Sequence, residues 1–326
     1  MKYIRNDSVN PYYNLALEEY VLKNFTDDSY VLLWQNDHTI VIGKHQNTMS
    51  EINEKAVNER GVKVVRRNTG GGAVYHDLGN LNFSYLDNWD GISDLGLDKF
   101  LQPVIRTLDK LGVQAEKRGR NDLLIEGRKI SGNAQTVQNK RILHHGTLLL
   151  NSNLEMMAEV LNVAKDKIET KGIKSVRSRV ANIQEYLKKD VSVDDFKTIL
   201  LETFFESGEI EEVHITSEQN FEILKLQKEK YETWEWNFGR SPQGNFINEE
   251  RFSGGKLAVE MVINNGLIAT CKIWGDFLTL LDISEIEEAM IGVRHESQAI
   301  RKTFNQYDLC KYFKDISIEE LMECFI

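Results

Sequence analysis

Apolar residues recur with a helical period in several segments of the chain. The clearest helix is predicted over 95–111, where six apolar residues keep one face: Leu97, Phe100, Leu101, Val104, Ile105 and Leu108. Pro103 lies inside this segment, where it can kink the helix or delay its start. The same pattern, with capping residues at the ends, predicts further helices over 11–25, 50–60, 154–161 and 193–206.

Short continuous apolar runs indicate strands. Buried strands are predicted at Tyr30–Trp34 and Thr39–Ile42, with a polar turn between them. The runs 123–126, 129 onward and 141–150 predict a strand meander. Because strands are grouped into meanders, with helices between the groups, the chain favours an α+β fold over a doubly wound sheet.

The pattern changes near residues 240–250. An aromatic segment there becomes turn-like, and residues 243–245 have the composition of a hinge. Beyond it, two apolar runs at 256–263 and 267–274 flank an Asn-Asn-Gly turn and predict a hairpin, followed by helices near 284–291 and 317–325. We therefore predict two domains, 1–244 and 245–326.

Composition narrows the class of protein. The 326 residues are 41% apolar and 28% charged, which is ordinary for a soluble globular protein. A net charge of −10 argues against a nucleic-acid partner bound by bulk electrostatics. The three cysteines form no CxxC pair, so we expect a reducing compartment. With no signal-like N-terminus and no apolar run near the roughly 18 residues of a membrane span, we expect a cytoplasmic protein without a membrane partner.

A glycine-rich stretch at 66–80 reads RRNTGGGAVYHDLGN and lies between two apolar, strand-like runs. Glycines without Cβ let the backbone approach a ligand closely, and bared N–H groups can form an anion-binding concavity. The neighbouring arginines add charge and paired donors. A flexible surface loop is the alternative, but a glycine run held between two strands favours a ligand site.

A second candidate region, 121–134, places Lys129 after a tight turn at Gly127 and before a run of small residues. An ammonium group above such a backbone suits a phosphate or carboxylate, although an ordinary solvated hairpin lysine has the same pattern. Further basic residues gather in the first 180 positions of this acidic chain, which is typical of a site for a small polyanion such as ATP. The sequence has no Walker loop, and no GxGxxG, HExxH or GxSxG motif.

Taken together, five segments in order resemble lipoate–protein ligases. They are RRxxGGGAVYHDLGN at 66–80, GRND at 119–122, GRKISG at 127–132, HHGTLL at 144–149 and KGIxSVRSR at 171–179, and the WxWNFG segment at 234–239 is also similar. The resemblance extends from residue 11 to about 242, and the length of the tail fits the family's accessory domain. It implies a catalytic domain of the biotin/lipoate ligase type, similar to class II aminoacyl-tRNA synthetases, plus a small α+β C-terminal domain.

The resemblance also implies a two-step reaction and its residues. ATP and lipoate would give lipoyl-AMP and pyrophosphate, and the lipoyl group would pass to a lysine of an acceptor lipoyl domain, either a dehydrogenase E2 subunit or the glycine-cleavage H protein. Octanoate is an alternative acid. Lys129 would be catalytic, placed between the acid's carboxylate and the α-phosphate of ATP. Mg²⁺ is expected on the phosphates, with Asp122 as its candidate ligand. The residues expected to bind the nucleotide are Arg67, Gly72, Ala73, Val74, Tyr75, His76, Asp77, Asn80, Asn121, Asp122 and Lys129.

The acyl chain needs an apolar slot, which we expect to be lined by Val41, Ile42 and the 143–150 strand. Three other functions compete with the ligase. An ATP-independent octanoyl or lipoyl transferase of the same fold would use a cysteine nucleophile, but no cysteine precedes Cys271. A biotin ligase would carry a different adenylate loop from the one at 66–80. A nucleotide-sensing or carrier-binding module would use the same site for recognition alone.

Overall fold

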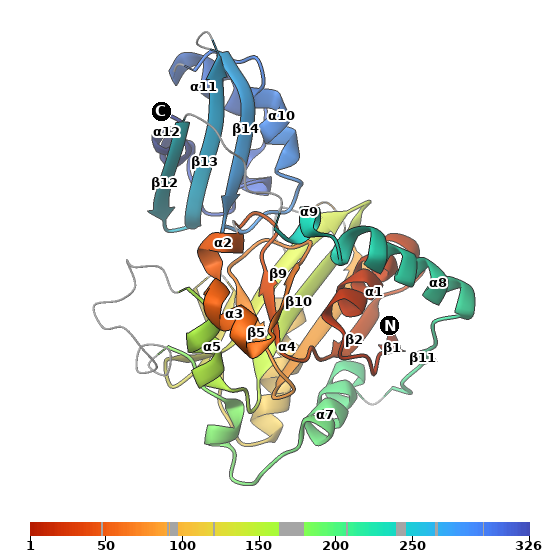
Figure 1. Ribbon diagram of the computed structural model, residues 1–326. Helices are drawn as coiled ribbons and strands as arrows, with labels where there is room; N and C mark the ends of the chain where they lie inside the picture. The colour runs from red at the N-terminus through yellow and green to blue at the C-terminus, as the bar shows by residue number, and fades with distance from the viewer. Residues whose placement is uncertain are drawn as a thin grey trace.

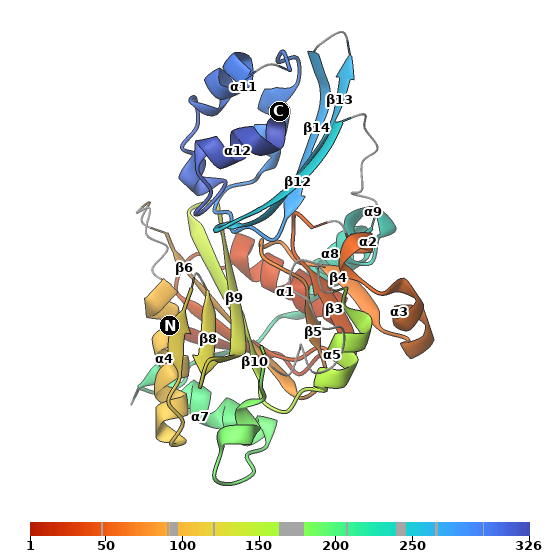
Figure 2. The same ribbon diagram turned by 90° about the vertical axis from the view of Figure 1, so that its left-hand side faces the viewer.

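The computed structural model describes residues 1–46, 48–89, 91, 97–119, 121–162, 179–206, 208–238, 246–264, 267–295 and 297–326. Figures 1 and 2 show a large lower body and a smaller body, residues 246–326, that stands on one end of it. Among the described residues, no helix combines the length and apolar character needed to cross a membrane.

A mixed sheet forms the centre of the lower body (Figure 1). Within the described ranges its eight strands run in the order β11 (Glu212–Val213), β1 (Lys2–Arg5), β2 (Tyr30–Trp34), β6 (Asn80–Asn88), β10 (Arg141–Leu149), β9 (Arg128–Gln138), β8 (Asp122–Ile125) and β7 (Glu116–Arg118). From β2 to β7 all neighbours are antiparallel, which confirms the predicted meander.

Helices cover both faces of this sheet. On one side α1 (Pro11–Asn24) packs with Tyr30, Leu32 and Trp34, whereas α4 (Leu97–Lys110) and α7 (Val193–Phe205) pack on the other side with Val31 and Leu33. The alternation along β2 follows from the two-residue period of a strand. The same period places consecutive residues of β10 on opposite faces of the sheet.

A second, smaller sheet lies beside the first. It has the order β4 (Lys63–Arg66), β3 (Thr39–Ile42) and β5 (Val74–His76). The helices α2 (Thr48–Glu51), α3 (Glu54–Arg60), α5 (Leu154–Val160) and α9 (Trp234–Asn237) lie around it (Figures 1 and 2). Within the described ranges, the lower body also contains the 3₁₀ helix η2 (Ile183–Tyr186), α8 (Ser217–Leu226) and the π-helix η3 (Gln227–Tyr231).

The C-terminal body has a core of its own. A three-stranded sheet of β12 (Phe246–Phe252), β13 (Gly255–Asn264) and β14 (Leu267–Gly275) packs against α10 (Ser284–Met290), α11 (Ser297–Phe304), η4 (Leu309–Lys311) and α12 (Ile318–Phe325). The predicted hairpin and the helices near 284–291 and 317–325 are confirmed.

Several local predictions need correction. The helix expected over 50–60 is two helices, because the side chain of Asn53 accepts a hydrogen bond from the Ala56 amide and so begins α3 anew. The helix α4 runs from Leu97 to Lys110 with Pro103 inside it. Sequence reasoning missed β1, β7, β11, β12, α8, α9 and α11, which are short, polar or both.

Candidate active site

The glycine stretch forms the connection from β4 to β5, which lie on opposite sides of β3. Gly71 adopts φ +93°, a conformation that disfavours any side chain. The loop also packs closely on its neighbours, since a Cβ added at Gly43 would lie 1.9 Å from the Gly71 carbonyl oxygen. Backbone conformation therefore requires glycine at position 71, and lack of space requires it at position 43.

Arg67 stabilises the conformation of this loop through hydrogen bonds. Its buried guanidinium donates hydrogen bonds to the carbonyl oxygens of Gly70 (2.7 Å), Gly72 (2.8 Å) and Val41 (3.1 Å), and to Thr69 Oγ1 (3.0 Å). Burial lowers the pKa of Arg67 to about 10, and the group stays a cation at neutral pH. Because the loop carbonyls turn toward Arg67, the arginine shapes the loop as well as lining the pocket.

Arg66 has a different role from the anion contact expected of both arginines. Its side chain is enclosed and donates to the carbonyl oxygens of Gly43 (2.8 Å) and Gln46 (2.6 Å), and to Thr48 Oγ1 (2.6 Å). Its backbone amide donates to Asn237 Oδ1 (2.8 Å). Arg66 does not line the pocket described below, so it ties the small sheet to the segments around it.

A hydrogen-bond chain connects the loop to helix α1. His145 Nδ1 lies 2.9 Å from the carboxylate of Glu18, and His145 Nε2 lies 2.7 Å from Thr69 Oγ1, which in turn accepts from Arg67. Ser84 Oγ donates to Glu18 at 2.6 Å. With a proton on His145 Nδ1, the hydrogen bonds lead from Arg67 and Thr69 through His145 to the Glu18 carboxylate.

The next residue of α1, Glu19, holds the loop from the other side. Its buried carboxylate accepts hydrogen bonds from Tyr231 (2.6 Å), Lys230 (2.7 Å), Asn68 (2.7 Å) and Lys23. Burial alone would raise the pKa of Glu19, but the charge of Lys230 and these hydrogen bonds lower it to about 2. Tyr231 ends the π-helix η3, a kind of helix that often occurs near functional sites. Asn68 and Thr69, which precede the glycines, are thus fixed by consecutive glutamates.

Lys129 lies on β9, at the turn from β8. Its Nζ pairs with Asp122 Oδ1 at 2.7 Å, and about a third of each side chain is exposed. A Cβ at Gly132 would lie 3.0 Å from Lys129 Nζ, so this glycine gives the lysine room to fold over the strand. Within the part of the chain that the structure describes, this ion pair is the one that holds the partly exposed lysine side chain.

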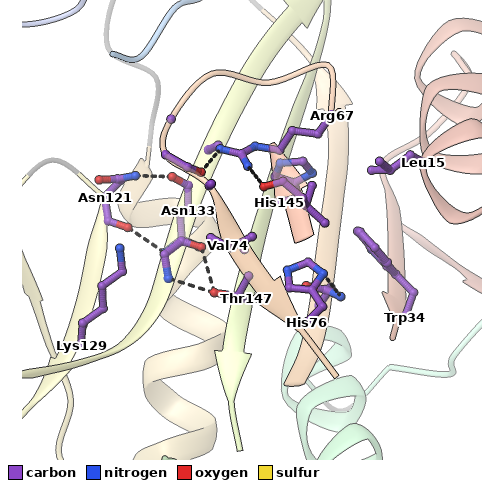
Figure 3. Close-up of a pocket in the computed structure, with 18 residues that line it drawn as sticks. Leu15, Trp34, Arg67, Val74, His76, Asn121, Lys129, Asn133, His145 and Thr147 are labelled. Carbon is purple, nitrogen blue, oxygen red and sulfur yellow. Dashed lines mark hydrogen bonds between the residues drawn. The ribbon is translucent and has the colours of Figure 1, made fainter. Parts of the chain in front are cut away.

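One pocket brings these groups together, and Figure 3 shows it from the side. Its polar end contains Lys129, Asn121 and Asn133, and its other end contains Leu15 and Trp34. The lining residues are Leu15, Trp34, Val41, Arg67, Gly71, Gly72, Ala73, Val74, His76, Asn82, Asn121, Lys129, Gly132, Asn133, Ala134, His145, Gly146 and Thr147. An elongated ligand with an anionic head and an apolar tail fits such a pocket.

Most of the residues selected from the sequence line this pocket: Arg67, Gly72, Ala73, Val74, His76, Asn121 and Lys129. Four do not. Tyr75 is buried with its hydroxyl 3.1 Å from His38 Nδ1, and Asp77 accepts hydrogen bonds from the amides of Gly79 and Asn153. Asn80 donates to Asn82, and Asp122 pairs with Lys129.

The slot expected for the acyl chain agrees in part with the pocket. Val41 and the β10 residues His145, Gly146 and Thr147 line it, whereas Ile42 packs in the core of the small sheet. Leu15, Trp34 and Asn82 are lining residues that sequence reasoning missed. Each belongs to a helix or strand whose pattern indicates core packing, so nothing local marks them.

Two features expected from the sequence, the cluster of basic residues and the metal ion, are not seen as sites in the described part of the chain. The basic residues Arg120, Lys171, Lys174 and Arg177 lie outside the described residues. Among the described residues, no group of three or more His, Cys, Asp or Glu side chains is arranged to hold a metal ion.

The C-terminal body contacts the glycine loop directly. The Gly71 amide donates to the Phe277 carbonyl at 3.3 Å, and the His45 ring stacks on the Phe277 ring with centroids 5.4 Å apart. Lys44 pairs with Asp282 at 2.8 Å beside them. The two bodies therefore meet at the loop that borders the pocket.

The chain thus combines an α+β fold with a pocket that extends from Lys129 and Asn121 to Leu15 and Trp34. The sequence of residues 10–205 matches the protein family described as lipoyl protein ligase A/B catalytic domain. Residues 241–325 match the family described as bacterial lipoate protein ligase C-terminus. The chain is 45% identical to lipoate–protein ligase 1 of Staphylococcus aureus and 44% identical to lipoate-protein ligase LplJ of Bacillus subtilis, over 99% of each chain.

Solved structures agree with these matches. P. falciparum LipL1 in complex with lipoate superposes with a TM-score of 0.80 at 28% identity, covering 94% of both chains. A bipartite lipoate protein ligase of Thermoplasma acidophilum, studied with its E2 lipoyl domain, gives 0.68 at 31% identity over 75% of this chain and 98% of its own. A lipoate-protein ligase A bound with ATP gives 0.65 at 29% identity over 73% and 98%. The chain belongs to the family of lipoate–protein ligases, enzymes that join lipoate to protein. The predicted family and the predicted α+β fold with a small C-terminal domain are confirmed.

Proposed function

We propose that this enzyme activates lipoate with ATP, forming lipoyl-AMP and pyrophosphate, and then transfers the lipoyl group to a lysine of a lipoyl domain. The observation that carries the proposal is the single pocket that contains both Lys129 and the Arg67-supported glycine loop at the head of an apolar slot. The ATP-bound and lipoate-bound relatives support both substrates.

The first step joins two anions, a carboxylate and the α-phosphate of ATP. Charge neutralisation and in-line positioning therefore supply most of the catalysis. Lys129 is the mobile point charge that can leave Asp122 to stand between the two anions. Its preference for the transition state that joins them would lower the barrier more than it strengthens binding of either reactant.

The glycine loop would hold the nucleotide. The backbone from Gly71 to Val74 borders the pocket, and the buried cation of Arg67 lies behind it, so the loop offers both close backbone approach and positive potential. Asn121 adds an amide at the Lys129 end. His76, Asp77 and Asn80 would order the segment that follows, with His76 facing the pocket.

Mg²⁺ would be held chiefly by the phosphates of ATP, since this ion keeps several waters and needs one or two protein carboxylates. Asp122 is the carboxylate beside Lys129 and fits that limited part. When bound, the metal would neutralise phosphate charge.

Residues 1–244 would form the catalytic domain and 245–326 the accessory domain. The separate core of the C-terminal body supports this division. The accepting protein would be an E2 lipoyl domain or the H protein, with the E2 domain supported by the archaeal ligase studied with one. A cytoplasmic location agrees with these partners.

An ATP–pyrophosphate exchange assay tests the proposal. Exchange should appear when lipoate or octanoate is added and should be absent without an acid. Lipoylation of purified E2 lipoyl domain and H protein should then require ATP. Transfer from an acylated carrier protein without ATP would instead indicate the transferase reaction.

A further inference from the structure

His76 lines the pocket and has an enclosed ring nitrogen that lacks a hydrogen-bond partner among the described residues. Its ring ends β5 and is 3% exposed, and it lies edge-on to Trp34 with centroids 6.2 Å apart. Figure 3 shows the ring on the Trp34 side of the pocket, across from Lys129. Among the described residues Nε2 has no hydrogen-bond partner. A buried polar atom of this kind indicates a missing ligand group.

Neighbouring backbone groups determine which ring nitrogen carries the proton. Asn14 Nδ2 lies 3.1 Å from the Ser8 carbonyl oxygen and 2.8 Å from the Gln35 carbonyl oxygen, so this atom must be the amide nitrogen. The Asn36 amide atom 2.9 Å from it must be oxygen, because two NH2 groups would repel each other at this distance, and the other atom of the Asn36 amide is therefore nitrogen. Asn36 Nδ2 then donates to His76 Nδ1 at 3.1 Å.

Because His76 Nδ1 accepts, the ring proton lies on Nε2. The ring stays neutral, since burial lowers the pKa of His76 to about 3. The Nε2–H of His76 is therefore a donor without a partner among the described residues, at the end of the pocket where Leu15, Trp34, Val41 and Asn82 are also lining residues.

We propose that the Nε2–H of His76 is a specificity-determining donor that recognises the sulfur-containing ring of lipoate and disfavours a plain hydrocarbon tail. The inference rests on the proposed function. With the carboxylate at Lys129, the tail of the acid extends toward His76. A ring sulfur is a weak acceptor and can satisfy the donor, whereas an alkyl tail covers it and leaves it without a partner.

Discrimination of this kind follows from general rules of binding. A pocket that offers a polar group rejects an analogue that cannot pair with it more strongly than a purely apolar pocket rejects a small change of shape. We expect kcat/KM for lipoate to exceed that for octanoate about 10-fold. Cyclopentylpentanoic acid, which keeps the ring and chain but has no sulfur, should be as poor as octanoate.

Two substitutions separate the two nitrogens of the ring. His76→Asn can place an amide oxygen near the Nδ1 position and keep the bond from Asn36, while removing the group at Nε2. His76→Gln can place an amide N–H near the Nε2 position and lose the bond from Asn36. We expect His76→Asn to bring the ratio of lipoate to cyclopentylpentanoate activation close to one, and His76→Gln to preserve most of it.

The measurement is ATP–pyrophosphate exchange with each acid, with thermal unfolding of both variants as a check of folding. An unchanged ratio in His76→Asn would overturn the inference. A ratio lost in His76→Gln and kept in His76→Asn would show that holding Asn36 is the role of the ring. A wild-type ratio near one would mean that water satisfies the donor. Absence of exchange with every acid would refute the proposed function instead.

Discussion

The Lys129 end of the pocket and the base of the glycine loop are built in opposite ways. Among the described residues Lys129 makes one ion pair, with Asp122, and about a third of its side chain is exposed. At the base of the loop, Glu18 and Glu19 are buried, and each accepts several hydrogen bonds. The group that we propose to act on the substrates is partly exposed to water, while the groups that fix the shape of the loop are buried.

The difference has an energetic reason. An exposed pair contributes roughly 0–1 kcal/mol to stability, so Lys129 can exchange Asp122 for a substrate anion at little cost. A buried carboxylate with several donors cannot be rearranged without leaving charges or donors unpaired. We therefore expect substitutions at the first end to change activity alone, and substitutions at the second end to change stability as well.

The largest effect is expected for Lys129→Ala. Removing the charge that joins carboxylate and α-phosphate should lower the rate of adenylation on the order of 10²-fold or more, with no change in melting temperature. Lys129→Arg should also be poor, because a planar fork does not replace a point charge between two anions. Lys188→Ala, at an exposed position outside the pocket, is the matched control. Near-normal pyrophosphate release by Lys129→Ala would contradict the assignment.

Glu19→Ala tests the buried end. It leaves Lys230, Tyr231 and Asn68 without their shared acceptor, so we expect a loss of about 3 kcal/mol in the free energy of unfolding. Urea unfolding measures it, with Glu222→Ala on the exposed face of α8 as control. Adenylation by the folded fraction should also fall, since Asn68 no longer fixes the loop. A Glu19→Ala protein as stable as the control would remove the distinction between the two ends.

Gly71→Val refines the comparison within the loop. Its φ of +93° disfavours a β-branched residue, and its Cβ would lie 3.0 Å from Arg67 Nη2. We expect ATP binding to weaken about 10-fold and lipoate binding to change less. Gly112→Val is the control, because Gly112 has φ +80° with nothing within 4 Å of its Cβ. Calorimetry with each ligand is the measurement, and equal weakening for both ligands would mean that the loop has only a structural role.

The two ends also differ in how far the sequence predicts them. Lys129, Arg67 and the glycines are local signals in the sequence. Lys129 is a charge beside small residues, and Arg67 precedes a glycine run whose backbone can approach a ligand closely. The hydrogen-bond chain from Arg67 through His145 to Glu18 joins residues that are far apart in the sequence. No period or spacing of residues predicts that they are in contact. Trp34 and Leu15 have the pattern of core residues, and they acquire a second role because the pocket opens beside them.

The same limit explains the errors in secondary structure. Long amphipathic segments such as 97–110 were predicted well because packing and periodicity agree along their whole length. Strand β12 was missed because its residues, FINEERF, are largely polar, and it forms through backbone pairing with β13. The short helix α9 depends on Asn237, whose side chain bonds to the carbonyl oxygens of Tyr231 and Thr233.

The smallest effect on activity is expected for the triple variant Cys271→Ser, Cys310→Ser, Cys324→Ser. The pocket, as described, contains no cysteine, and all three belong to the C-terminal body. Burial raises the pKa of the Cys271 thiol, and it raises that of Cys324 to about 12, so neither forms a thiolate near neutral pH. Cys310 is exposed, although free cysteines in apolar segments are usually buried.

The triple variant decides between ligase and transferase chemistry. A ligase activates its acid as an anhydride with AMP and needs no thiol, whereas the transferase needs a cysteine that becomes acylated. We expect the variant to lose about 1–3 kcal/mol of stability, because serine hydroxyls replace two buried thiols, and to keep ATP-dependent lipoylation of an acceptor domain. Alkylation of the wild type should modify Cys310 without loss of turnover. Loss of transfer in a folded serine variant, or a thioester trapped on the wild type, would require the transferase mechanism and would leave the charge of Lys129 without its proposed use.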